Sequence, residues 1–270
     1  AAAGPNRGRD AGLAPEPKDG INYGLVVDLV RGICRAERGA PGAPGAIIIF
    51  CPGQAEISRM VTALCGNDEV GRDSNKLWVL PLHASLPPQE QRRVFARPPG
   101  EAMRKIVVST NIAETSITID DATHVIDLGR VREIRYETGA RVSMLKEVLT
   151  SQAAAQQRAG RAGRVRAGTA WRMYTEDTFD DMPAHTAAEM LRTPLDELVL
   201  QVLLLELGQP RRFLRSALQP PPKRMVDAAV ENLMAIGAVV VGRREGDGGV
   251  VVDAGVEDVD DDMVGEEEAE

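Results

Sequence analysis

The chain has 270 residues, enough for one large or two modest domains, and 43% of them are hydrophobic. Only 3% are aromatic, which leaves little material for a base-stacking platform, so any nucleic-acid contact is expected to be mainly to the backbone. The three cysteines form no CxxC pair, which argues against a disulfide framework and suits a reducing compartment, and no run of 18 apolar residues predicts a membrane span.

The first elements alternate between helix and strand. Residues 1–20 are rich in Ala, Gly and Pro, and with neither a starting Met nor a leader they predict a disordered linker in a fragment. Apolar residues at helical spacing predict a helix over 21–39, and Ala46–Phe50 (AIIIF) is a continuous apolar run typical of a buried strand. A second helix is expected from Gln54, ending at Gly66.

The alternation continues with a short strand, a helix and two further strands, at 77–80, 88–95, 105–109 and 123–127. Strands that alternate with helices favour an α/β fold with a parallel sheet that is covered on both faces. In such sheets ligands bind at the carboxyl ends of the strands.

Residues 131–148 interrupt this pattern, because two extended runs around Glu137–Ala140 predict a β-hairpin with a longer loop. The hairpin is basic, with Arg130, Arg132, Arg135, Arg141 and Lys146. Ser151 is then expected to begin a helix that ends near Gly160–Gly163, and residues 168–174 return as a strand.

The C-terminal part becomes mainly helical in pattern and then strongly acidic in composition. Helical patterns from Thr193 onward, a Pro-rich break at 220–222 and a short apolar strand after a Gly are similar to a small winged-helix unit. Beyond residue 244, twelve acidic residues occur without a Lys or Arg, so the net charge of −8 becomes +4 for residues 1–244. We expect a disordered acidic tail that either keeps the protein soluble or competes with nucleic acid for the basic part.

The strongest chemical signal is Gln157–Arg164, QRAGRAGR. Arg158, Arg161 and Arg164 recur every three residues, which predicts guanidinium groups on nearby faces of one helical segment, with glycines that allow close approach. Such groups suit the spread negative charge of a phosphoryl group in transfer. The alternative is a solvated basic helix.

These residues resemble motif VI of the DEAH-box helicases in helicase superfamily two. Ser109–Asp120 (STNIAETSITID) resembles their motif V, and Phe50–Ile57 (FCPGQAEI) is similar to motif IV. The segments Leu80–Phe95, Leu191–Leu207 and Leu218–Val239 are also similar to the family, in collinear order over residues 20–240. The resemblance implies a RecA-like three-layer α/β domain with an inserted hairpin over 21–184, a partial, mostly helical winged-helix domain over 185–243, and a tail over 244–270.

The resemblance also implies roles for matching residues. Gln157, Arg161 and Arg164 would face the nucleotide phosphates, the two arginines as arginine fingers, whereas Ser116, Thr118 and Asp120 would line the nucleotide side of motif V. Contacts to the RNA backbone would come from Gly53, Gln54, Thr110 and Asn111. The hairpin, with Arg132 and Arg135, would lie at the fork where strands separate, or would only pack on neighbouring domains. Ala55 stands where many relatives carry an acidic residue, so no charge role is expected there.

The sequence contains neither a GxxxxGK[ST] phosphate loop nor a DEAH quartet. We therefore expect ATP and Mg²⁺ to be bound mainly through a missing N-terminal RecA-like domain, leaving this half inactive alone. The resemblance implies the C-terminal motor half of an ATP-dependent RNA helicase, an intracellular enzyme of cytoplasm, nucleus or an organelle, with RNA and ATP as ligands. The alternatives are a non-catalytic RNA-binding scaffold module and a DNA helicase fragment.

Overall fold

The computed structural model describes residues 17, 20–37, 44–66, 77–100, 103–115, 117–137, 142–164, 167–241 and 250–252. The chain divides into two compact units, one of residues 1–135 and 144–187, the other of residues 136–143 and 188–270. Most of the predicted linker and of the predicted acidic tail lies outside the described residues.

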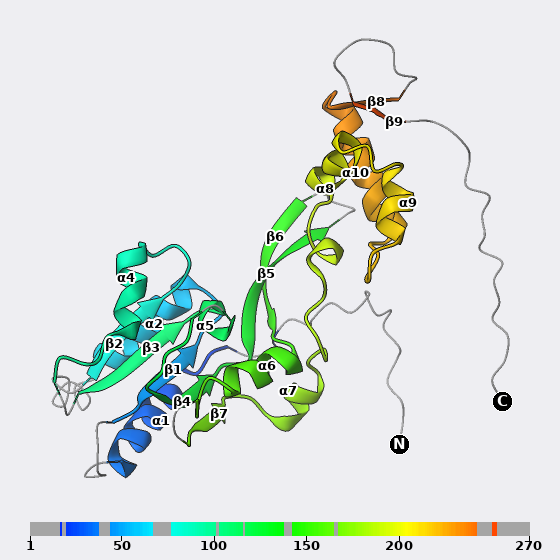
Figure 1. Ribbon diagram of the computed structural model, residues 1–270. Helices are drawn as coiled ribbons and strands as arrows, with labels where there is room; N and C mark the ends of the chain where they lie inside the picture. The colour runs from blue at the N-terminus through cyan, green and yellow to red at the C-terminus, as the bar shows by residue number, and fades with distance from the viewer. Residues whose placement is uncertain are drawn as a thin grey trace, which may run out of the picture. The chain divides into compact units, whose positions relative to one another are not determined.

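The first unit is built on a five-stranded sheet in the order β2-β3-β1-β4-β7 (Figure 1). Its strands are β1 Ala46–Phe50, β2 Leu77–Leu82, β3 Arg104–Ser109, β4 Ala122–Asp127 and β7 Thr169–Arg172. All four neighbouring pairs are parallel, as the alternating sequence predicts. Residues of β1, β3 and β4 are buried throughout, because helices cover both faces of a parallel sheet.

Alternate residues of each strand pack against different layers. On one face, Ile47 and Ile49 lie in a cluster with Val30 of α1 (Tyr23–Ala36) and Met60 of α2 (Gln54–Cys65). On the other face, Ile48 and neighbouring residues pack with Val94 of η2 (Arg93–Phe95), which follows α4 (Pro88–Arg92), and with Ala113 of α5 (Ile112–Thr115). The result is the three-layer arrangement expected from the sequence.

A hairpin is inserted between β4 and the next helix. Its strands are β5 (Arg130–Glu137) and β6 (Val142–Leu149), which form a separate two-stranded sheet (Figure 1). The predicted hairpin is therefore confirmed. Ser151 then caps α6 (Gln152–Ala159), because its hydroxyl accepts a 3.1 Å hydrogen bond from the Ala154 amide. A short helix, α7 (Glu176–Asp180), follows β7.

Charged side chains form ion pairs at the end of the sheet where the amino termini of its strands lie. The Glu37 carboxylate accepts a 2.5 Å hydrogen bond from Arg104 Nη2 and lies 2.6 Å from His124 Nε2. Burial by itself raises the pKa of Glu37, but hydrogen bonds from His124 and Arg104 outweigh it, so the pKa is lowered overall. The buried ammonium of Lys105 donates to the Val94 carbonyl at 2.8 Å and lies 2.7 Å from Asp121 Oδ1.

The second unit has a small core of its own. Its elements are η3 Glu189–Leu191, α8 Asp196–Leu204, α9 Pro210–Arg215, α10 Lys223–Ala235, β8 Val239–Val241 and β9 Val250–Val252. The buried side chains of Val199, Val202, Leu214, Met225 and Leu233 pack together. Val250–Val252, expected to belong to a disordered tail, instead pair with β8. The winged-helix assignment of this unit stays a prediction.

No helix within the described ranges combines the length and the apolar character needed to cross a bilayer.

Candidate functional site

The loops that carry the predicted site residues meet at the carboxyl ends of the strands. The Cys51 amide, just after β1, donates a 2.7 Å hydrogen bond to the carbonyl of Ser109, the last residue of β3. The Thr110 amide donates to the carbonyl of Leu82, the last residue of β2, at 3.1 Å. Three strand ends are thus joined by backbone hydrogen bonds, which fixes the start of the motif V segment.

The motif V segment forms a single helical turn followed by an irregular stretch. Thr110 is half-buried, and Asn111 is exposed immediately before α5. Thr118 and Asp120 are exposed, whereas Ile119 between them is buried in the core. This alternation anchors the segment and leaves the two polar side chains accessible. Ser116, predicted with them, lies outside the described residues.

The motif VI arginines lie beside this segment. Helix α6 ends at Ala159, so Arg161 and Arg164 occupy the turns after it, and Gly163 has a φ of 83° that favours glycine. Arg164 Nη1 donates a 2.7 Å hydrogen bond to Thr118 Oγ1, and Arg161 Nη1 donates to the Ile117 carbonyl at 3.4 Å. Motifs V and VI are therefore brought together, as their predicted roles require. Gln157 is exposed on α6.

Arg161 has the properties of a residue that binds an anion. Burial, together with the positive charge of Arg164, lowers the pKa of Arg161 from its ordinary value. Its Nε–H is buried, and no side chain or backbone group among the described residues accepts it. A buried donor without an acceptor is costly unless a ligand oxygen satisfies it, so these residues fit a phosphate group.

Arg158 corrects one sequence expectation. The three arginines do not project from one helical segment, because only Arg158 lies within α6. Its side chain is 1% exposed and is enclosed by Glu114 and Asp127. Sequence reasoning missed Asp127 altogether. The available signal was an acidic residue at the end of an otherwise apolar strand, a position that needs a partner when it is buried.

The residues predicted to bind RNA include a close group around the first turn of α2. Gln54 is exposed, and Gly53 precedes the helix with an extended φ of −161°. A Cβ at Gly53 would lie 2.9 Å from Arg132 Cδ, so the absence of a side chain there lets Arg132 approach. Arg132 in turn pairs with the buried carboxylate of Glu56 at 3.0 Å, and Arg135 pairs with Glu133 at 3.1 Å.

The structure therefore brings Gly53 and Arg132 together, and Glu56, a further member of this group, was missed by sequence reasoning. An acidic residue next to the buried Ile57 and near the buried Met60 was the signal that could have identified it. Within the described ranges, no group of three or more His, Cys, Asp and Glu side chains has the arrangement of a metal site.

Comparisons with known proteins agree with this geometry. Residues 31–166, half of the chain, match the model of the helicase conserved C-terminal domain. The chain is 44% identical over 219 residues to the DExH-box ATP-dependent RNA helicase DExH1 of Arabidopsis thaliana, and 40% identical over 218 residues to the ATP-dependent RNA helicase DHX29 of Homo sapiens. Each alignment covers 81% of this chain, but only 21% and 16% of the relative, respectively.

The crystal structure of the Escherichia coli DExH-box NTPase HrpB superposes with a TM-score of 0.68 at 29% identity, over 84% of this chain and 26% of that one. The predicted RecA-like α/β class and the predicted family resemblance are thereby confirmed. This chain belongs to the helicase conserved C-terminal domain family, and its homologues are DExH/DEAH-box ATP-dependent RNA helicases.

Proposed function

We propose that this chain is the C-terminal motor half of an ATP-dependent RNA helicase and that it supplies arginine fingers and RNA-backbone contacts for translocation and unwinding. The observation that carries this proposal is the pairing of the motif VI turns with motif V, in which Arg161 and Arg164 bond to Ile117 and Thr118. Two guanidinium groups are held side by side there, and one of them has an unsatisfied buried donor.

The nucleotide would be held between this chain and a first RecA-like domain. ATP would supply the phosphoryl group, and Mg²⁺ would neutralise its charge through ligands on the first domain. Arg161 and Arg164 would stabilise the charge that develops during transfer, with Gln157 beside them. Thr118 and Asp120, exposed on the same segment, would orient groups near the ribose and the attacking water. Ser116 is proposed for the same side.

RNA would contact the strand ends through its backbone. The exposed Gln54 and Asn111, with Gly53 and Thr110 beside them, offer amide and hydroxyl donors to phosphates. Arg132 and Arg135 would add positive charge from the hairpin. The RNA-facing loops follow β1 and β3, and the arginine turns lie between α6 and β7 of the same sheet. Closure around ATP would therefore shift both together and move the bound RNA by a step.

The test uses the polypeptide in which this chain is joined to its first motor domain. Replacing Arg164 with Ala should leave ATP binding intact and reduce RNA-stimulated hydrolysis by about 10³-fold or more, the usual worth of an arginine finger. Arg92→Ala, which removes an arginine from α4, is the matched control. Normal turnover by Arg164→Ala would refute the finger assignment, whereas no RNA-stimulated hydrolysis by the unmutated polypeptide would favour a non-catalytic RNA-binding scaffold.

The hairpin and the nucleic-acid preference are tested separately. Deleting residues 132–146 should spare RNA-stimulated hydrolysis and abolish unwinding, whereas unchanged unwinding would mean that the hairpin only packs. Backbone contacts discriminate poorly between RNA and DNA. Hydrolysis should therefore be compared with matched RNA and DNA oligonucleotides, and stronger stimulation by DNA would favour a DNA helicase.

A further inference from the structure

Arg158 is the most enclosed charged side chain of the first unit, yet the proposed phosphate chemistry does not use it. Its side chain is 1% exposed, so it cannot face a nucleotide as Arg161 and Arg164 can. Arg158 Nε donates a 2.9 Å hydrogen bond to Glu114 Oε2, and Nη1 donates a 2.8 Å hydrogen bond to Asp127 Oδ1. The guanidinium carbon lies 5.2 Å from the centre of the Phe50 ring.

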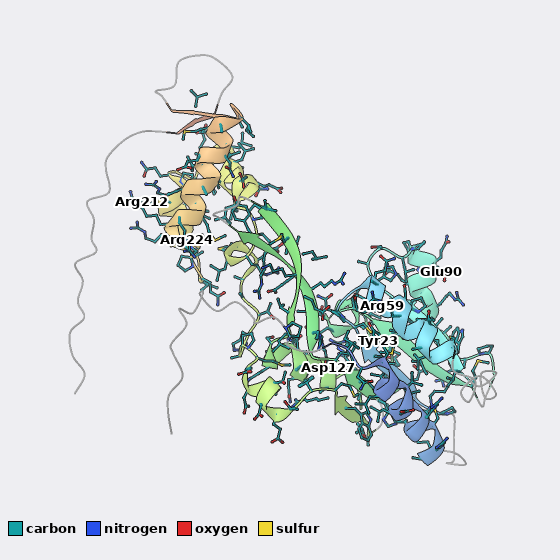
Figure 2. All side chains as sticks on the ribbon, turned by 180° about the vertical axis from the view of Figure 1, so that it is seen from behind. Tyr23, Arg59, Glu90, Asp127, Arg212 and Arg224 are labelled. Atoms are coloured by element: carbon teal, nitrogen blue, oxygen red, sulfur yellow. The ribbon has the colours of Figure 1, made fainter. Side chains whose placement is uncertain are left out.

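The contacts of Arg158 join segments that are distant in sequence. Glu114 lies in α5, within motif V, and Asp127 is the last residue of β4 (Figure 2). Arg158 Nη1 also donates to the carbonyl of Arg130, the first residue of β5, at 3.3 Å. One side chain from the motif VI helix therefore touches the motif V turn, the sheet end and the start of the hairpin.

Further hydrogen bonds hold the Asp127 carboxylate that binds Arg158. Asp127 Oδ1 accepts a 2.9 Å hydrogen bond from the Gly129 amide, and Asp127 Oδ2 accepts one from the Tyr174 hydroxyl at 3.2 Å. The Gly129 carbonyl accepts the amide of Thr150, which follows the second hairpin strand, at 2.9 Å. Both ends of the hairpin are thus linked, through Gly129, to the carboxylate that binds Arg158.

The network is rigid for electrostatic reasons. Burial favours the neutral form of Arg158, but the charges of Asp127 and Glu114 outweigh it and raise the Arg158 pKa. A buried guanidinium with two carboxylates has fixed geometry, because breaking either pair would leave an uncompensated buried charge. Lysine cannot reproduce the arrangement, since it lacks the planar fork that reaches two carboxylates at once.

We propose that Arg158 is a positioning residue that ties the motif V turn, the motif VI helix and the base of the β5–β6 hairpin into one rigid body, so that hydrolysis is coupled to hairpin movement. The proposal rests on the proposed helicase function, in which Arg161 and Arg164 respond to the nucleotide. It gives Arg158 a role distinct from theirs. Arg158 transmits displacement and makes no contact with ATP.

The activity test compares Arg158→Lys with Arg172→Lys in the polypeptide that includes the first motor domain. Arg172 is a matched control, because its guanidinium also lies over an aromatic ring, that of Phe179 at 4.4 Å, but it forms no ion pair with a carboxylate among the described residues. Arg158→Lys should retain most RNA-stimulated hydrolysis and lower the number of base pairs unwound per ATP by about tenfold. Arg172→Lys should leave this ratio unchanged.

Glu114→Gln is the second variant, since it keeps the side-chain shape and removes one charge. It replaces Arg158→Lys in the test if that variant does not fold. It should lower the same ratio in the same direction. An unchanged ratio, with hydrolysis and unwinding falling in proportion, would overturn the proposal. A merely structural role predicts that proportional loss.

Hydrogen exchange of the present chain separates this inference from the helicase function, because it requires neither ATP nor a first motor domain. In Arg158→Lys, backbone amides of residues 112–115 and 130–135 should exchange faster together by about tenfold, while those in Arg172→Lys should not. Faster exchange confined to α6 would overturn the inference. Should Arg164→Ala hydrolyse ATP normally, the finger assignment of the proposed function would fail even where the exchange result holds.

Discussion

The guanidinium of Arg164 donates a 2.7 Å hydrogen bond to the hydroxyl of Thr118, a residue 46 positions earlier in the chain. The two residues belong to the segments that resemble motifs VI and V. This hydrogen bond between two side chains of the chain itself orients the arginine. Orientation before binding lowers the conformational entropy that a ligand would otherwise have to remove.

Removing the Thr118 hydroxyl should therefore weaken catalysis without abolishing it. Thr118→Val keeps the side-chain shape and leaves Arg164 charged but unanchored. We expect kcat to fall by about tenfold, since a hydrogen bond to a charged group contributes roughly 1.5 kcal/mol. Steady-state hydrolysis beside Arg164→Ala measures this. A loss as large as that of the arginine variant would mean that Thr118 itself acts on the reacting atoms.

Arg132 should contribute to the salt dependence of RNA binding. If its guanidinium reaches a phosphate, Arg132→Ala should reduce the slope of log K against log salt concentration by about 0.7 on single-stranded RNA. Fluorescence anisotropy at several salt concentrations measures the slope, and Arg35→Ala on α1 is the control. A weaker affinity with an unchanged slope would show that Arg132 acts only through its ion pair with Glu56.

Lys105 should be important for stability because its ammonium is buried and bonded to three acceptors, the carbonyls of Val94 and Ala96 and the carboxylate of Asp121. Lys105→Met should lower the free energy of unfolding by about 3 kcal/mol, as expected when one partner of a buried ion pair is removed. Urea denaturation measures this loss.

The control for Lys105 is an ion pair of similar length at the surface. Arg93 and Glu90 lie 2.7 Å apart with both side chains about half exposed. Arg93→Met should cost less than about 1 kcal/mol, because water and ions screen an exposed pair. Equal losses in the two variants would contradict the importance of burial.

Glu37 should make the fold sensitive to acid. Its folded-state pKa is lowered, so its contribution to stability is complete above the ordinary value of 4.5 and is lost as pH falls through the lower folded pKa. Glu37→Gln should be less stable than the wild type at pH 7, and the two stabilities should converge below pH 4.5. Urea unfolding at a series of pH values tests this, and parallel curves would refute it.

The sheet could be predicted from the sequence because short strand segments, of which β1 is a continuous apolar run, alternate with helical segments. Strand β2 was predicted to end at Leu80, but it continues through Pro81 to Leu82. In the observed order β2 lies at the edge of the sheet, where a proline costs no ladder hydrogen bond on its open side. Position within a sheet is a tertiary property, so local sequence could not reveal it.

The short helices could not be predicted for a different reason. Helices α5, α7 and α9 have four, five and six residues, too few for an apolar periodicity to appear. By contrast, Ser151 identified the start of α6, because a capping hydroxyl acts within three residues of itself. An interaction between residues that are close in sequence can therefore be recognised in the sequence.

The candidate site was likewise only partly predictable from the sequence. The motif segments and the proximity of their residues could be predicted, since the resemblance fixes both. The burial of Arg158 could not, because Asp127 and Glu114 lie 31 and 44 positions away and only the folded chain brings them to it. Three arginines with equal spacing in sequence thus have two unlike environments.

The Nε–H of Arg161 is buried and has no acceptor among the described residues, so it suits an oxyanion ligand. A buried donor without an acceptor destabilises the native state, and any ligand that satisfies it only in that state raises the melting temperature. Inorganic phosphate or pyrophosphate should therefore shift a dye-monitored melting curve of the chain upward, and sodium chloride at equal ionic strength should not. Phosphate mimics could therefore be ranked by the rise in melting temperature that each causes, before any turnover is measured.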